Sequence, residues 1–395
     1  MRRPGVLVLL LIAGCDFGFK PESLVERLRV LGLRSTPADL APGETAQLEA
    51  LTPDPTGTPT TLLWLGCEAD PFNLNRTACA DTNLLDDPAS FVGDGGVLPT
   101  GVSLIGFNGT ASYATSPSLF DVLPVDDARR QSGTVGQLLV FAVAEAISPF
   151  ASRDELQAVF ERVQRKELEA IVSLYRVHIS QSSERNSNPV VGALTVDGVA
   201  WPSGARVAVK PGAPATIDVE VPDGDFEPYT NLTPDGPVAE TEHLLAAWYS
   251  TAGRFSHTRT ALREDVKTLL TPPGSGDATD AVPADRAGTL WVVVRDTRGG
   301  QSWRQWPMYV CDATLPEPRI TTVEWPTGSR AKVVLRGDDL GSILDVSVDG
   351  VALEQGAFVA SRGTWEGSLP EGVPLGISRG ELTTRTCQRR PLEAQ

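Results

Sequence analysis

The chain has 395 residues, with 50 Asp and Glu against 34 Lys and Arg and a formal net charge of −16. A surface this acidic repels nucleic acid and anionic lipid headgroups, so it excludes both as electrostatic partners. A chain of this length is too long for one hydrophobic core, and we expect two to four domains.

The first fifteen residues have the pattern of an export signal. A basic head of Arg2 and Arg3 precedes an apolar run over residues 6–13, which leads through small residues to Cys15. This order is typical of a secretory signal peptide. The run is shorter than the roughly 20 residues that cross a bilayer as a helix, so we expect cleavage rather than a membrane span.

Residues 12–15, Ile-Ala-Gly-Cys, resemble the lipobox of bacterial lipoproteins, in which a lipid is attached to the cysteine and the peptide is cut just before it. The resemblance implies a signal peptide over 1–14, lipidation of Cys15 and a lipidated tether over 15–24. Each buried methylene contributes about 0.8 kcal/mol, so two or more acyl chains hold a protein firmly on a membrane. The alternative is a plain signal peptide with an incidental cysteine.

Cleavage before Cys15 would leave 32 Lys and Arg against 50 Asp and Glu, a net charge of −18. The expected location is the bacterial cell envelope, with the outer membrane or cell surface favoured over the inner membrane. Asp16 retains lipoproteins in the inner membrane of enteric bacteria, a rule that does not transfer to other lineages. The sequence therefore does not indicate which membrane leaflet would carry the lipid anchor.

Four further cysteines follow, namely Cys67, Cys79, Cys311 and Cys387. An even number in an exported chain favours disulfides, and three pairings are possible. We favour Cys67–Cys79, which closes a short loop inside one domain, so that Cys311–Cys387 follows by elimination and ties the ends of the last domain together. Neither pair has the C-x-x-C spacing of a zinc site.

Residues 25–181 predict an immunoglobulin-like β-sandwich. Short alternating stretches broken by Pro and Gly turns are typical of this fold. A strand over 61–66 carries Trp64 as the core aromatic residue. A later strand, over 137–145, is apolar at successive positions and is expected to be buried on both faces.

Two segments interrupt this first sandwich. The alternation weakens over 68–136, which we interpret as a decorated insertion pinned by the Cys67–Cys79 bridge, because a structureless loop of that length is uncommon in a compact domain. Residues 152–166 predict a helix, since Ser152 and Glu155 have capping-box spacing and apolar residues recur at helical intervals. The helix is expected to pack against the sandwich or, alternatively, to present a partner-binding face.

A polar, turn-rich segment at 182–189 marks a domain boundary. A second sandwich is predicted over 190–311. It opens with a hairpin at Asp197-Gly198, and its clearest strand covers 290–295.

Residues 317–388 predict a third sandwich. A strand is followed by Gly-x-x-Leu-Gly at 337–341, a second strand over 343–348 and an Asp349-Gly350 turn. This order resembles the IPT/TIG variety of immunoglobulin-like domain. The predicted fold class is therefore mainly β, with tandem immunoglobulin-like β-sandwiches and one inserted helix in the first domain.

Three carboxylates alternate at Asp223, Asp225 and Glu227 and are weak candidates for a calcium site, since calcium takes six to eight oxygen ligands. The bidentate glutamate of an EF-hand is missing further along the chain, so a solvated turn is the favoured interpretation. We expect no metal and no cofactor.

The sequence contains no motif of a known catalytic site. Its histidines, His178, His243 and His257, accompany no Gly-x-Ser-x-Gly, His-Glu-x-x-His or glycine-rich phosphate loop. Trp201 and Trp303 are candidates for an exposed aromatic platform that would bind sugar or peptide. Alternation along 302–306 predicts that at least one tryptophan there belongs to the core.

As a whole the chain resembles cell-surface lipoproteins of GC-rich gliding bacteria such as myxobacteria, which begin with a Leu-Arg-Val-Leu strand and a Pro-Gly turn, as at 28–31 and 42–43. The resemblance implies envelope location and β-sandwich modules but no activity. The first hypothesis is a non-enzymatic binding or structural module with an envelope protein or glycan as partner. The alternatives are a carbohydrate- or peptide-binding accessory subunit and a hydrolase with a site in 68–136.

Overall fold

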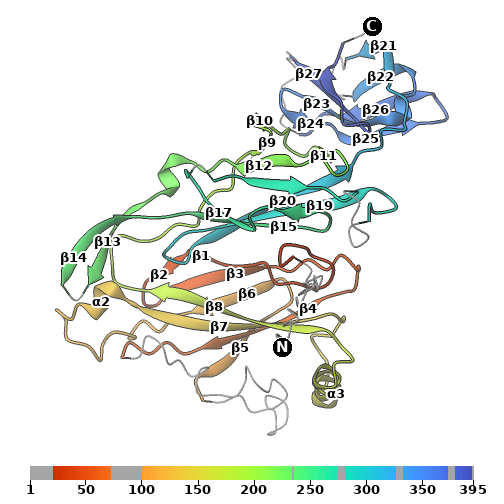
Figure 1. Ribbon diagram of the computed structural model, residues 1–395. Helices are drawn as coiled ribbons and strands as arrows, with labels where there is room; N and C mark the ends of the chain where they lie inside the picture. Colours follow the sequence, from red (N-terminus) through yellow and green to blue (C-terminus); the bar gives the residue numbers. More distant parts are fainter. Residues whose placement is uncertain are drawn as a thin grey trace, which may run out of the picture.

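The computed structural model describes residues 21–72, 100–233, 235–264, 266–274, 281–325, 332–371 and 379–393. They form three β-sandwiches in a row (Figure 1), which confirms the mainly β, tandem immunoglobulin-like fold. Two α-helices occur in the described residues, α2 (Arg129–Ser132) and α3 (Arg153–Gln164). Cys15, Asp16 and Cys79 lie outside these ranges.

The first sandwich is one eight-stranded sheet wrapped around a core. Its strands are β1 (Gly32–Thr36), β2 (Asp39–Leu40), β3 (Thr45–Leu51), β4 (Thr61–Cys67), β5 (Val102–Phe107), β6 (Thr110–Ala114), β7 (Thr134–Val143) and β8 (Ala170–Ile179). The order is β1-β3-β6-β5-β4-β7-β8-β2, so β1 and β2 are neighbours in the chain yet lie at opposite ends of the sheet. Trp64 is fully buried at the centre, as predicted, and its indole Nε1 donates to the carbonyl of Asn108 over 2.9 Å.

The prediction of a decorated insertion over 68–136 is wrong for residues 102–114. β5 pairs with β4, and β6 pairs with both β5 and β3, so the two strands are part of the sandwich itself. Alternation is weak in β5 because Ser103 and Leu104 are both exposed. Residues 73–99 lie outside the described part of the chain.

Strand β7 is buried on both faces, as its continuous apolar sequence predicts. Leu138 and Val140 face the core of the first sandwich, while Leu139 and Phe141 face outward and are covered. The cover includes helix α3, whose Phe160 lies edge-on to Phe141 with ring centroids 6.4 Å apart. The helix thus packs on the sandwich.

The predicted capping box starts helix α3. The Ser152 hydroxyl accepts from the Glu155 N–H over 3.3 Å, and the Glu155 carboxylate accepts from the Ser152 N–H over 2.7 Å. Two of the orphan N–H groups of the first turn are thereby satisfied.

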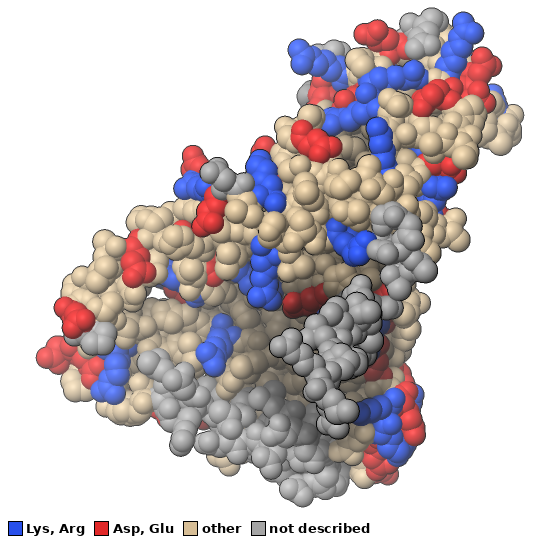
Figure 2. Space-filling view, in the orientation of Figure 1, with Lys and Arg blue, Asp and Glu red and all other residues tan. Residues whose placement is uncertain are grey.

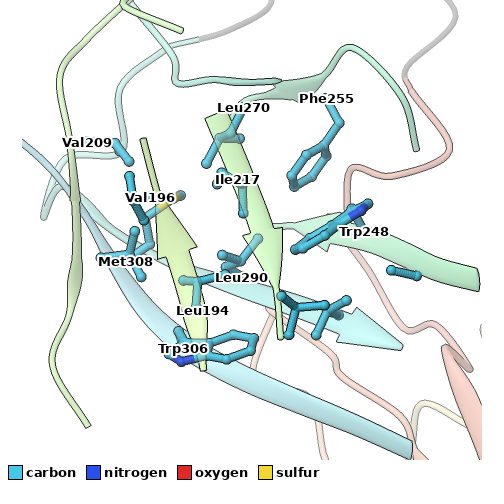
Figure 3. Close-up of a cluster of buried hydrophobic side chains, with 14 of the residues drawn as sticks. Leu194, Val196, Val209, Ile217, Trp248, Phe255, Leu270, Leu290, Trp306 and Met308 are labelled. Carbon is cyan, nitrogen blue, oxygen red and sulfur yellow. The ribbon is translucent and has the colours of Figure 1, made fainter. Parts of the chain in front are cut away.

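The second sandwich has two five-stranded sheets. Their strands are β9 (Leu194–Val196), β10 (Val199–Ala200), β11 (Val207–Val209), β12 (Ala215–Val219), β15 (Leu245–Ser250), β16 (Arg254–Phe255), β17 (Arg259–Ala261), β18 (Thr268–Thr271), β19 (Ala287–Arg295) and β20 (Gln301–Val310). The orders are β10-β9-β12-β18-β16 and β11-β20-β19-β15-β17. Trp248, Trp306 and Met308 are buried between the sheets (Figure 3). The Asp197-Gly198 turn joins β9 to β10, with positive φ at both residues.

A two-stranded hairpin projects from the second sandwich, built from β13 (Pro228–Thr233) and β14 (Gly236–Thr241). It follows the 3₁₀ turn η1 (Asp223–Asp225). In Figure 1 the hairpin lies beside α2 of the first sandwich. Leu232 and Val238 are exposed, which explains why no apolar run revealed this arm in the sequence.

The third sandwich has two four-stranded sheets around buried Trp365. Its elements are β21 (Arg319–Glu324), β22 (Lys332–Asp338), η2 (Leu340–Ser342), β23 (Ile343–Val348), β24 (Val351–Ala352), β25 (Glu354–Val359), β26 (Thr364–Ser368), β27 (Gly380–Thr384) and β28 (Arg389–Pro391). A Cys311–Cys387 disulfide connects the residue after β20 to the turn between β27 and β28. It therefore links the second sandwich to the third covalently. The prediction that this disulfide ties the ends of the last domain together is wrong.

Substituting Phe160→Ala should release helix α3 from the first sandwich. The side chain is 4% exposed, and its loss removes both burial and the ring contact, which costs about 3–5 kcal/mol in a core. We expect faster hydrogen exchange and proteolysis over residues 145–168, with the third sandwich unchanged. Gln157→Ala, on the exposed face of the helix, is the control; equal exchange in both variants would contradict this role of Phe160.

Candidate functional site: a cleft between the first two sandwiches

The first two sandwiches meet along the outer face of strand β19. Leu290, Val292 and Val294 face the core of the second sandwich, while Trp291 and Val293 pack outward against Val25 and Leu31 of the N-terminal segment. The continuous apolar sequence of β19 thus reflects burial on two sides, as in β7.

The end of the predicted tether belongs to this interface. Ser23 is buried, and its carbonyl accepts from the Ser250 N–H over 2.9 Å, while Val25 N–H donates to the Ser250 carbonyl over 2.8 Å. Residues 23–25 therefore lie along strand β15 of the second sandwich rather than in a free linker.

The two tryptophans of the predicted platform are covered by arginines of neighbouring sandwiches. The Arg34 guanidinium lies 4.7 Å from the ring centroid of Trp303, and that of Arg389 lies 5.1 Å from Trp201. They do not form one exposed surface. Trp306 is 3% exposed, in agreement with the expectation that one tryptophan of this strand is core.

The polar segment 182–189 is a bonded bridge between the sandwiches. The Asn188 amide donates to the Ser35 carbonyl over 2.8 Å and accepts from the Gln301 N–H over 3.0 Å. Asn186 donates its N–H to Asp39 Oδ2 over 3.0 Å and its amide to Asp296 Oδ2 over 3.2 Å. Each asparagine therefore joins the first sandwich to the second, so the predicted boundary is not a flexible hinge.

Asp296 shapes the turn that follows β19. Its Oδ1 accepts from the N–H groups of Arg298, Gly299 and Gly300 over 2.7–2.8 Å. Gly299 has a φ of +106°, a conformation that side chains with a Cβ rarely adopt. This turn directs Arg298 toward the root of the β13–β14 arm.

Arg298 clamps the arm at both of its ends. Its guanidinium pairs with Glu242, which follows β14, and with Glu227, which precedes β13, the latter over 2.5 Å. Its Nη1 donates to the Glu184 carbonyl over 3.1 Å, and its Cζ lies 5.1 Å from the Tyr229 ring centroid. One cation thus fixes the arm and the bridging segment together.

A cleft of about 570 Å³ opens between the arm, the bridging segment and the edge of the first sandwich. Its volume lies within the range of small-ligand sites. Most of the lining residues are of polar type, and they come from three parts of the chain: Asp39, Ala128, Gln131, Ser132 and His178; Ser182, Ser183 and Glu184; and Tyr229, Thr230, Asn231, Leu232 and Arg298.

His178 and Asp39 form a pair at the base of this cleft. His178 Nδ1 lies 3.3 Å from Asp39 Oδ1, and His178 Nε2 lies 2.9 Å from the carbonyl oxygen of Ser132. Burial lowers the pKa of His178, but the Asp39 carboxylate and the Ser132 carbonyl outweigh it and raise the net pKa above its ordinary value.

Two carboxyl groups near the cleft have raised pKa values. Burial raises the pKa of Glu242 to about 7; Arg298 opposes this effect, while Asp296 and Glu227 add to it. Burial also raises the pKa of Asp296, against the hydrogen bonds from Asn186 and the turn. Burial is thus the main reason that both groups resist ionisation.

The candidate calcium ligands are separated and engaged by different partners. Asp223 pairs with Arg263, Asp225 accepts from the Val190 N–H over 2.5 Å, and Glu227 pairs with Arg298. Within the described ranges, no group of three or more His, Cys, Asp and Glu side chains is arranged to hold a metal ion.

His257 is the described histidine that contacts a serine hydroxyl: its Nδ1 lies 3.1 Å from Oγ of the neighbouring Ser256, and both residues are exposed and lie outside the cleft. His243 is also exposed, and His178 Nε2 is engaged by a main-chain carbonyl. The described parts of the 68–136 segment contain no histidine or cysteine. A second cavity of about 460 Å³ lies there, beside Tyr113, where burial and then Glu68 raise the tyrosine pKa to about 12.

Cys67 is disulfide-bonded, and its predicted partner Cys79 lies outside the described residues. Cys15, the predicted lipidation site, also lies outside them. No helix in the described ranges has the length and apolar character needed to cross a membrane.

Sequence reasoning did not identify the cleft. Asp39, His178 and Arg298 are more than a hundred residues apart in sequence, and no spacing signal joins them. The Asp-x-Arg-Gly-Gly turn at 296–300 was recognisable as a turn, but nothing in it predicted that its arginine would reach Glu227 and Glu242.

No protein-family model matches this chain, and no curated protein matches it. Among solved structures it is similar to SGBP-B of the Bacteroides ovatus mixed-linkage glucan utilization locus, in complex with a mixed-linkage heptasaccharide (10% identity; 92% of this chain, 66% of that chain; TM-score 0.16). A 1.5-MDa bacterial ice-binding adhesin (12%; 93% and 96%; 0.19) and PcdhgB3 EC1-4 (12%; 95% and 74%; 0.20) also match.

The chain spans just under two thirds of the SGBP-B structure and 33% of latent PorU from Porphyromonas gingivalis, another match. TM-scores of this size carry no weight for fold or function. The assignment of the fold therefore depends on the sheets described above.

The Glu242 carboxyl should make stability depend on pH. The pKa of Glu242 is about 7 in the folded state, against an ordinary value of 4.5. Between pH 4.5 and pH 7 the folded protein therefore keeps a proton on Glu242 that the unfolded chain has released. The stabilisation is full below pH 4.5 and is lost as pH rises through 7.

The free energy of unfolding, measured by calorimetry, should fall between pH 4.5 and pH 7 by about 1–3 kcal/mol more in the wild type than in Glu242→Gln, after allowance for screening by solvent. An exposed carboxylate in the third sandwich, changed by Glu354→Gln, is the control. Equal pH slopes for wild type and Glu242→Gln would contradict the assignment.

Proposed function

We propose that the protein is a lipid-anchored binding module of a bacterial cell envelope, attached through Cys15, that takes up its partner in the cleft between the first two sandwiches. The basic head, short apolar run and Ile-Ala-Gly-Cys sequence over 1–15 support the anchor. The resemblance to myxobacterial surface lipoproteins and that of 317–388 to IPT/TIG domains are consistent with this location.

The observation that carries the binding role is the cleft itself. Two sandwiches, a bonded bridge and a clamped arm hold open a cavity lined by polar residues and their apolar portions, so a ligand would bind without large rearrangement of the walls. The described residues offer hydrogen-bonding groups there but no activated nucleophile. A glycan or a peptide of an envelope assembly is the class of partner that such a lining suits.

Anchoring has a direct test. Cells expressing the full-length protein and supplied with radioactive palmitate should label the wild type and not Cys15→Ser. The variant should also move from the membrane fraction to the released fraction, because it loses its acyl chains. Equal labelling of both proteins would refute the anchor, and a Cys67→Ser variant controls for acylation at another cysteine.

Partner uptake at the cleft can be tested with a photo-cross-linking residue. Placed at Leu232, on the arm, it should yield a cross-linked species in intact cells that disappears when Ser183→Trp narrows the cleft. Phe358 in the third sandwich is the matched control, because its exposed fraction of 43% is close to the 41% of Leu232. The same product from both positions, or one insensitive to Ser183→Trp, would place the partner elsewhere.

A further inference from the structure

We propose that the cleft binds its ligand through a protonated primary amine, with the Asp39 carboxylate as acceptor and the His178 imidazole as the competing group. The proposal takes from the proposed function only that the cleft is the binding site. It adds the chemical group of the ligand that the cleft recognises.

The acceptor is an unsatisfied oxygen of a buried carboxylate. The Asp39 side chain is 5% exposed and lines the cleft. Its Oδ2 accepts from the Asn186 N–H, whereas the described residues offer Oδ1 only His178 Nδ1, 3.3 Å away, which donates to it when the imidazole is protonated. Leaving a buried charged acceptor without a donor is costly, so a donor at this position would be stabilising.

The neighbouring imidazole defines what kind of donor fits. A carbonyl oxygen only accepts, so the 2.9 Å contact with Ser132 assigns a proton to His178 Nε2. In the neutral ring, Nδ1 then presents a lone pair 3.3 Å from Asp39 Oδ1. Two acceptors face each other, and an ammonium group with three N–H donors could bond to both after a movement of the partly exposed His178 side chain opens Oδ1, which is closed to solvent in the structure.

Protonation of His178 removes the acceptor pair that the ammonium group would bind. An imidazolium Nδ1–H would neutralise the Asp39 charge and repel an incoming cation. The pKa of His178 is raised above its ordinary value by Asp39 and Ser132 despite the opposing effect of burial. Amine binding should therefore strengthen as pH rises and the histidine loses its proton.

The charges around the pair favour a cation over an anion. Arg298 of the second sandwich lines the same cleft and pairs with Glu227 and, where its carboxyl is ionised above about pH 7, with Glu242. Asp296 lies in the same turn, and Glu184 comes from the bridging segment, where its carboxylate accepts from the Thr230 N–H.

Helix α2 packs against the same side of the pair and contributes two arginines. Arg129 pairs with Asp127, and Arg130 is bonded to the carbonyls of Leu123 and Pro124. Arg185 of the bridging segment donates to the Asp39 carbonyl over 2.7 Å and pairs with Glu44. Arg130 keeps its positive charge, but the carboxylates of Asp39, Asp296 and Glu184 outnumber it, which disfavours a phosphate or carboxylate ligand.

The experiment titrates the full-length protein with Nα-acetyl-lysine amide and, as its uncharged counterpart, Nα-acetyl-norleucine amide. By calorimetry the amine should bind about tenfold more tightly at about pH 8 and lose most of this advantage at about pH 6. A second arm compares glucosamine with N-acetylglucosamine at about pH 7. Tighter binding of the lysine probe assigns the amine to a peptide partner, and tighter binding of glucosamine assigns it to a glycan.

Three variants locate the effect. Asp39→Asn should weaken amine binding about tenfold while keeping an acceptor for Asn186, and His178→Gln should abolish the pH dependence. Ser183→Trp, at the exposed rim, should block the probe without touching the buried pair, which keeps the test valid if Asp39→Asn fails to fold. Asp338→Asn, exposed in the third sandwich, should bind as wild type.

Equal affinity for charged and uncharged probes would overturn the proposal, and so would wild-type binding by folded Asp39→Asn and Ser183→Trp. Such a result leaves palmitate labelling and cross-linking unaffected. Failure of the amine hypothesis is thereby distinguishable from failure of the proposed function.

Discussion

The arrangement of the molecule depends on burial of strand β19 on both faces. One face closes the core of the second sandwich, and the other packs Trp291 and Val293 against the N-terminal segment. Each apolar side chain so buried contributes about 1.5–3 kcal/mol. This contact sets the first two sandwiches side by side, and every polar interaction at the cleft requires that placement.

Polar contacts then fix the geometry that apolar burial leaves undetermined. Apolar packing is non-directional, whereas hydrogen bonds from Asn186 and Asn188 and the Arg298 clamp require defined distances and angles. The third sandwich is joined by comparable means. The Arg206 guanidinium bonds to Asp345, and the Cys311–Cys387 disulfide covalently links the two sandwiches.

The concentration of acid groups at the junction has a structural cost that a binding role would explain. Asp39 Oδ1 is buried with only His178 Nδ1 beside it, and Glu242 holds its proton up to about pH 7. Elsewhere the charges are interspersed, as the face drawn in Figure 2 shows. A junction needed only for stability would gain more from apolar residues of similar size.

Local sequence signals predicted local structure well. Strand β4 with Trp64, the capped helix α3 and the Asp197-Gly198 hairpin are specified by residues close together in the chain, through side-chain alternation, capping and turn chemistry. Strand β5 was not recognised as a member of the sandwich because its exposed positions blur the alternation, and β6 is only five residues long. The arm was missed because its strands are largely exposed and contain no apolar run.

The sequence by itself determined the fold class and the expectation of an anchor at Cys15, because both follow from composition and short-range pattern. It also contained the continuous apolar run of β19, but the run does not say which surface covers the second face. Only the tertiary structure brought together Asp39, His178 and Arg298 and turned the polar segment 182–189 into a bridge. The physical reason is that such contacts join residues far apart in the chain, where no periodicity or spacing relates one partner to the other.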